Sequence, residues 1–163
     1  MKETIQKDLM NNRWNLIIIS DQFFLTSKSV INFFKVILQK IEFKYVILDR
    51  IEGSPAKGQN WPLLPVRKDI ILNTNDLLNL LQNINQLDWG DFFFFKEYPK
   101  NWSNKKNQSY PSVIAQSDTA IRLVDNQFFY VYTPYEQIKN CLENKYDIES
   151  YKIDFLNQLE YPE

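Results

Sequence analysis

Hydrophobic and polar positions along this chain follow two spacings, one typical of strands and one typical of helices. The clearest strand pattern consists of two short runs of β-branched and aromatic residues, Thr119–Val124 and Phe128–Thr133. Between them stands Asp125-Asn126-Gln127, a sequence suited to a tight turn. The pattern predicts a β-hairpin.

The register of this hairpin depends on the length of its loop. A two-residue loop places Leu123 opposite Phe128, whereas a three-residue loop ending at Gln127 places Leu123 opposite Phe129. A slip of one residue moves the side chains of one strand to the other face of the sheet. We favour the three-residue loop because it puts Ile121, Leu123, Phe129 and Val131 on one face, and Arg122, Val124, Phe128, Tyr130 and Tyr132 on the other.

A helix is predicted directly after the hairpin. Thr133 is a candidate N-cap, Pro134 suits the first helical position, and Glu136 completes a capping box. The following apolar residues recur at helical spacing on one stripe: Tyr135, Ile138, Cys141 and Leu142.

The rest of the chain supplies further strands and two further helices. One helix is expected over Val30–Ile41, and another begins at Asn73 or Thr74, continues through Leu87 and ends at Gly90. The expected strands are Trp14–Ile19, Phe43–Leu48, Asp91–Glu97 and Glu149–Ile153, with Ile70–Leu72 as a candidate short edge strand.

The order of elements is β-α-β-loop-α-β-loop-β-β-α-β, which predicts one α+β or α/β domain over residues 1–163. We expect a mixed sheet of about five to six strands and about three main helices. Residues 1–12 are polar and form either a short helix or a loose N-terminal arm, and 155–159 is a candidate terminal turn of helix.

Two segments, Arg50–Asp69 and Tyr98–Ser112, interrupt the pattern and are expected to be long loops. Loops of this length within a compact domain are uncommon and are usually functional or mobile.

Composition narrows the class of protein. With 163 residues, 44% of them hydrophobic, the chain is long enough for one domain with a core. The formal net charge of −1 makes nucleic acid an unfavoured partner. A single cysteine excludes an internal disulfide, and the start of the chain has no apolar stretch typical of a signal peptide. We therefore expect a cytoplasmic protein that does not enter a membrane.

The chain contains no histidine, which excludes Ser-His and Cys-His nucleophilic pairs and every histidine-containing metal site. No glycine-rich phosphate loop is present. Cys141 lies on an apolar helical stripe without a base to activate it, so we expect it to be inert. The sequence predicts a protein that is not an enzyme and that needs no cofactor and no metal.

Carboxylates provide the alternative chemistry. Asp88, Asp91 and Asp118 would form an acidic site if the fold brought them together. That arrangement would support a small-molecule-binding or carboxylate-based enzymatic domain. Asp88 and Asp91 are otherwise turn-forming residues, because Asp side chains hydrogen-bond to nearby backbone.

The two long loops carry the better candidates for a binding surface. Aromatic and arginine side chains supply the anchors of most protein interfaces, and lysines accelerate association. The candidate partner-binding residues are Trp61, Leu64, Arg67, Tyr98, Lys100, Trp102, Lys105, Lys106 and Tyr110.

A small, histidine-free, aromatic-rich α+β domain without a catalytic set resembles the immunity proteins that bacteria pair with secreted toxins, such as those of contact-dependent inhibition. The resemblance is one of overall character across the whole chain. It implies a non-catalytic partner of a cognate protein toxin domain, bound at or beside the toxin's active site.

Overall fold

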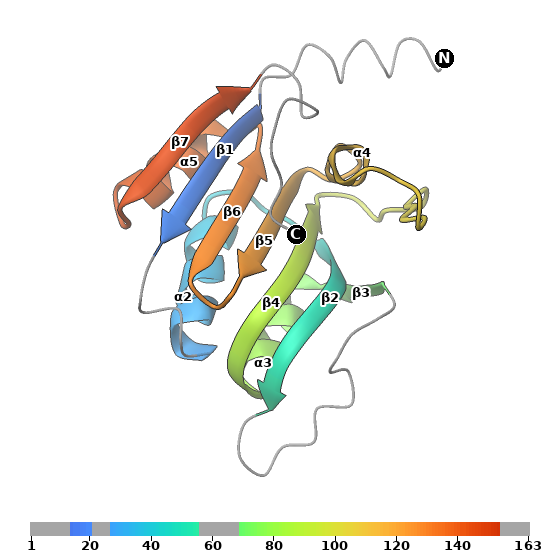
Figure 1. The fold of residues 1–163 in the computed structure, drawn as a ribbon, viewed down its shortest axis with the longest axis horizontal. Helices are drawn as coiled ribbons and strands as arrows, with labels where there is room; N and C mark the ends of the chain where they lie inside the picture. Colours follow the sequence, from blue (N-terminus) through green and yellow to red (C-terminus); the bar gives the residue numbers. More distant parts are fainter. Residues whose placement is uncertain (1–13, 21–26, 56–68, 154–163) are drawn as a thin grey trace.

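Seven strands form one antiparallel sheet in the order β3-β2-β4-β5-β6-β1-β7 (Figure 1). The structure is a computed structural model, which describes residues 14–20, 27–55 and 69–153. Its strands are β1 (Trp14–Ser20), β2 (Tyr45–Pro55), β3 (Ile70–Asn73), β4 (Ile84–Phe95), β5 (Thr119–Val124), β6 (Phe128–Thr133) and β7 (Ile148–Ile153). Within the described residues the helices are α2 (Ser27–Leu38), α3 (Thr74–Leu81), α4 (Tyr110–Ile114) and α5 (Glu136–Glu143).

The chain is therefore a single α+β domain, which is one of the two predicted fold classes. The prediction of a mixed sheet with five to six strands was wrong. The candidate edge strand does form, as β3, and every pair of neighbouring strands is antiparallel. Whether neighbouring strands run parallel or antiparallel depends on which segments of the chain pair with each other. The hydrophobic pattern within a single strand does not show this.

The sheet separates two hydrophobic cores. Helices α2, α3 and α5 pack on one face through buried residues such as Phe33, Leu77 and Ile138. The other face, called the open face below, is covered in part by α4 and by the residues before it, with Val113 and Ile114 buried there.

Strand β4 contributes to both cores because its four consecutive phenylalanines alternate in direction. Phe92 and Phe94 join the core under the three helices, whereas Phe93 and Phe95 join the core of the open face. All four are buried, so this run belongs entirely to the core.

The hairpin has the favoured register, with Leu123 opposite Phe129 and Val124 opposite Phe128. Asp125 and Asn126 both have positive φ angles, 51° and 49°. Asp and Asn tolerate this left-handed conformation better than most residues, which explains their place in the turn. The turn also contacts β4, because the Asn126 amide donates to the backbone oxygen of Asp88 at 3.0 Å.

The helix that was predicted to run to Leu87 ends at Leu81 instead. Its start is as expected, since the Asp76 amide donates to the Asn73 side chain at 2.8 Å. Residues from Ile84 onward pair with the end of β2, and this pairing outweighs their helical spacing. Gly90 is not a C-cap but a strand residue, and a Cβ there would lie 2.6 Å from the ring of Phe92.

The first predicted long loop is partly strand. Residues 50–55, expected to begin the loop, continue β2 beyond a bulge at which Arg50 has a φ of 43°. The remainder of the loop, 56–68, lies outside the described residues. A bulge interrupts the alternation from which a strand is recognised in sequence.

The predicted capping box does not form. Helix α5 begins at Glu136, and Tyr135 is its N-cap without a side-chain hydrogen bond. Thr133 is buried at the end of β6, where its hydroxyl accepts from the Tyr135 amide at 3.2 Å and contacts the hydroxyl of Thr119 at 2.9 Å. Glu136 instead forms an ion pair with Lys152 at 2.6 Å. Pairing of Thr133 within the sheet keeps it out of the helix.

In the described part of the chain, no helix has both the length and the apolar character needed to cross a membrane.

Candidate functional site

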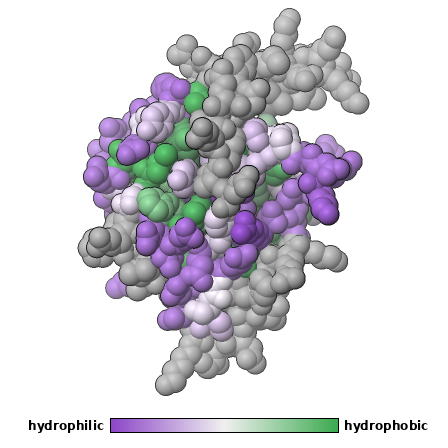
Figure 2. Space-filling view, viewed as in Figure 1, coloured by the Kyte–Doolittle hydropathy of each residue, from purple (hydrophilic) through white to green (hydrophobic). Residues whose placement is uncertain are grey.

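Hydrophobic and hydrophilic residues divide the open face of the sheet. Figure 2 shows the hydrophobic part over β1 and β6, and hydrophilic residues toward β2, β4 and the segment before α4. Strand register aligns Asp49 on β2 with Asp91 on β4, Arg122 on β5 and Tyr130 on β6. Residues directly opposite on neighbouring strands lie on the same face. A row of polar side chains therefore crosses four neighbouring strands, β2, β4, β5 and β6.

Asp91 and Arg122 form the centre of this row. Arg122 donates from Nε to Oδ1 at 2.5 Å and from Nη2 to Oδ2 at 3.1 Å. Tyr110 of α4 covers the pair: its hydroxyl donates to Asp91 Oδ1 at 3.2 Å, and its ring lies 3.6 Å from the guanidinium carbon. Asp91 is only 2% exposed, so this is a buried ion pair. Burial raises the pKa of Asp91, and the hydrogen bonds from Arg122 oppose that shift.

Asp49 brings a second carboxyl group to the row. The pKa of Asp49 is raised to about 6, most of all by burial and further by the negative charges of Asp69 and Asp91. A hydrogen bond from Asn104 has the opposite effect. Asp49 therefore changes its charge close to neutral pH.

The segment between β4 and α4, residues 96–109, is called the basic loop below. Its centre is fixed to the open face by Trp102 and Asn104. The Trp102 ring packs on Phe93 at 4.9 Å between centroids, and its Nε1 donates to Asp69 Oδ2 at 2.6 Å. Asn104 Nδ2 donates to Asp49 Oδ2 at 2.9 Å.

Two further contacts fix the centre and the start of the basic loop. The backbone of Ser103 makes a pair of hydrogen bonds with the side-chain amide of Gln116, at 2.9 and 2.7 Å. The Lys96 amide donates to Asp118 Oδ2 at 2.6 Å. A loop without regular secondary structure is thus held by at least five side chains. Such a loop loses little conformational freedom when it binds a partner.

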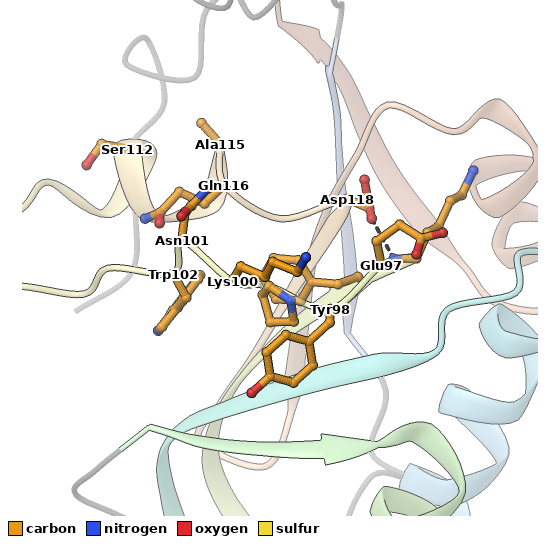
Figure 3. Close-up of a pocket in the computed structure, with 12 residues that line it drawn as sticks. Glu97, Tyr98, Lys100, Asn101, Trp102, Ser112, Ala115, Gln116 and Asp118 are labelled. Carbon is orange, nitrogen blue, oxygen red and sulfur yellow. Dashed lines mark hydrogen bonds between the residues drawn. The ribbon is translucent and has the colours of Figure 1, made fainter.

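A pocket of about 970 Å³ lies between the basic loop, the end of β4 and the connection from α4 to β5. In the close-up, Glu97 and Asp118 lie on one side of Lys100, and Ser112 and Gln116 lie on the other (Figure 3). The volume of this pocket is typical of ligand and side-chain binding sites.

The predicted binding residues of the second loop divide into anchoring and exposed ones. Trp102 and Tyr110 are half-buried and hold the loop and the ion pair in place. Tyr98 is 52% exposed and meets the ring of Tyr45 edge-on at 5.4 Å. The exposed lysines of the predicted set are Lys100, Lys105 and Lys106. Trp61, Leu64 and Arg67 lie outside the described residues.

The three predicted acidic residues have different surroundings. Asp88 accepts hydrogen bonds from Gln86 and Asn126 near the hairpin turn. Asp91 pairs with Arg122 in mid-strand, and Asp118 accepts from Lys96 at the other end of β4. No group of three acidic or cysteine residues within the described ranges could hold a metal ion.

The fold instead gathers Asp49, Asp69 and Asp91, of which the sequence singled out only Asp91. Asp49 directly follows an apolar strand, and a charged residue continuing such a strand could have marked it. Gln116 and Asn104 carried no comparable signal, because their roles depend on contacts with residues distant in sequence. Cys141 is half-buried and donates to the oxygen of Ile138 at 3.1 Å.

Comparisons with known proteins leave the site to be interpreted from its own geometry: no protein-family model, no curated protein and no solved structure matches the chain significantly.

Proposed function

We propose that this protein is a non-catalytic binding module, an immunity protein that binds and neutralises a cognate bacterial toxin in the cytoplasm. The observation that supports the proposal is the basic loop, which is exposed at its surface and fixed at its base. Trp102, Asn104 and Gln116 hold it, while Tyr98 and Lys100 stand beside a pocket. Interfaces commonly combine an aromatic anchor, a pocket and a charged rim.

Tyr98 is the anchor that we expect to contribute most to affinity. It is the large aromatic residue of the loop with more than half of its surface exposed. Loss of a true anchor costs at least ~2 kcal/mol of binding, or about thirtyfold in affinity. Trp102 is less suitable than Tyr98 for a binding test, because replacing it would also remove its hydrogen bond to Asp69 and so release the loop.

The test uses the purified chain as bait in a lysate of its native host, followed by titration of the recovered protein. Tyr98→Ala should weaken binding about thirtyfold. Tyr151→Ala is the matched control, since Tyr151 on β7 is 51% exposed and lies off the loop. Co-expression should also protect cells from the recovered partner. Equal affinity of the two variants would place the contact elsewhere, and recovery of no protein partner would oppose the proposed function.

The gathering of Asp49, Asp69 and Asp91 favours one second candidate, a carboxylate-based site for a small molecule. A carboxyl group with a pKa of about 6 is suited to proton transfer near neutral pH. A metabolite that raises the melting temperature of the protein, but not that of Asp49→Asn, would favour this alternative over toxin binding.

A further inference from the structure

Positive charge is concentrated on the basic loop. It contains four lysines and one glutamate, although the whole chain has a formal net charge of −1. The side chains of Lys100, Lys105 and Lys106 are exposed, and none of them makes an ion pair with another described residue. The fourth lysine, Lys96, lies 4.5 Å from the ring centre of Tyr135.

The carboxylates beneath the loop do not neutralise these lysines. Asp69 accepts from the indole of Trp102, Asp49 accepts from Asn104, and Asp91 pairs with Arg122. Asp69 and Asp49 therefore hold the loop from below, while the side chains of Lys100, Lys105 and Lys106 are exposed to solvent. In Figure 2 the loop forms a hydrophilic projection at the edge of the molecule.

The two adjacent lysines stand on a fixed turn. The Lys105 amide donates to Gln108 Oε1 at 3.2 Å, and the Gln108 amide donates to the oxygen of Lys105 at 2.9 Å. Lys105 and Lys106 are thus presented by backbone that is ordered before any partner arrives. Preorganised charge improves both the rate and the orientation of association.

We propose that the basic loop is the docking surface for an acidic protein, whose carboxylates meet Lys100, Lys105 and Lys106. This inference rests on the proposed function and adds the chemistry of the partner to it. Charge complementarity is the basis: an uncompensated basic projection on a protein of net negative charge selects acidic surfaces and disfavours basic ones.

A protein fits this surface better than a nucleic acid does. Nucleic-acid affinity arises from many phosphate contacts along an extended basic surface. Here four exposed lysines share one loop, and the adjoining strand β2 carries Asp49 and Glu52, with Asp69 directly before β3. Such carboxylates would repel a polyphosphate backbone that extended beyond the loop.

The experiment titrates the isotope-labelled protein with a capped hexaglutamate peptide and follows its amide resonances. The largest shifts should fall within residues 96–109. Lys105→Gln/Lys106→Gln should weaken binding about three- to tenfold, as expected for two exposed charge pairs. The matched control is Lys40→Gln/Lys145→Gln, which removes two exposed lysines from other elements and should leave the affinity unchanged.

Three results would overturn the inference: no binding of the peptide, shifts spread equally over lysines elsewhere, or equal losses in both double variants. Tighter binding of an oligothymidylate of the same charge would reassign the loop to nucleic acid. These outcomes are distinguishable from failure of the proposed function. A toxin that binds equally well to the Lys105→Gln/Lys106→Gln variant contradicts only the docking surface, whereas peptide binding without any protein partner contradicts only the immunity role.

Discussion

Arg122 holds Asp91 by two parallel hydrogen bonds across two central strands, at a position where Asp91 is almost completely buried. Removing one partner of such a pair leaves a charge in a site that water does not reach. We therefore expect Arg122→Met to lower the free energy of unfolding by about 3–5 kcal/mol, measured by chemical denaturation.

Arg50→Met is the control for that experiment. The Arg50 side chain is 49% exposed and pairs with an equally exposed Glu52, so its loss should cost about 1 kcal/mol or less. The double variant Asp91→Leu/Arg122→Met should recover part of the stability lost in Arg122→Met. Equal effects of the two arginine substitutions would show that the buried pair has no special role.

Asp49 should make stability depend on pH. Its pKa is about 6 in the folded protein against an ordinary value of 3.8, so the folded state binds the proton more tightly. The stabilisation that comes from this tighter proton binding is fully present below about pH 4 and decreases as the pH rises toward 6. Asp49→Asn should thus gain stability relative to the natural chain between these values and hold that gain at higher pH.

Thermal unfolding from pH 4 to pH 8 provides the measurement. The asparagine oxygen still accepts from Asn104, so the loop contact is kept. If the stability difference between Asp49→Asn and the natural chain did not vary with pH, the raised pKa of Asp49 would be contradicted.

Gln116 should control the mobility of the basic loop. Its side chain makes two hydrogen bonds to the backbone of Ser103, each contributing about 0.5–1.5 kcal/mol. In Gln116→Ala the Ser103 amide should exchange with solvent about tenfold faster or more. Gln137→Ala, which removes an exposed glutamine from α5, is the control. Unchanged exchange would show that the loop is ordered without the Gln116 side chain.

Thr133 should stabilise the fold through its buried hydroxyl rather than as a helix cap. A helix cap at Thr133, as the sequence predicted, would have been worth about 1 kcal/mol. The structure predicts about 1–3 kcal/mol for Thr133→Val, because the Tyr135 amide and the Thr119 hydroxyl lose a partner. Thr133→Ser should keep most of the stability. Equal denaturation midpoints for the valine and natural proteins would refute this role.

Cys141 should react slowly with thiol reagents in the folded protein. Burial raises the pKa of its thiol, and the thiol donates to the oxygen of Ile138. Labelling with a chromogenic disulfide at pH 8 should be far slower than in the urea-unfolded chain. Comparable rates in the two states would indicate an accessible thiolate.

The sequence predicted best the elements whose pattern is local. The hairpin register followed from separating the two faces of β5 and β6, and the cap at Asn73 followed from one side chain and a nearby amide. The predictions were wrong where distant pairing decides the outcome. Residues 84–87 have helical spacing but join β2, and Thr133 has the chemistry of a cap but is held in the sheet beside Thr119.

The candidate site also combines features that the local sequence shows with features that depend on distant contacts. Tyr98 and the lysines of the second loop were identifiable by type and by the length of the segment. The sequence did not show which of these aromatic residues is exposed, because Trp102 is half-buried through contacts with Phe93, Phe95 and Asp69, which are distant in the chain or on another element. Asp49 joins the site through strand order, which no stretch of sequence near it encodes.

Because the four phenylalanines of β4 alternate between two cores, the fold should tolerate substitutions in this segment differently from deletions. Exchange of Phe93 or Phe94 for another large apolar residue alters one core and leaves the other in place. Deletion of a single codon among them would turn every later side chain of the strand to the opposite face. The basic loop, whose first residue Lys96 donates to Asp118, would then follow a strand end that points the wrong way. This segment should accept substitutions far more readily than any change of length.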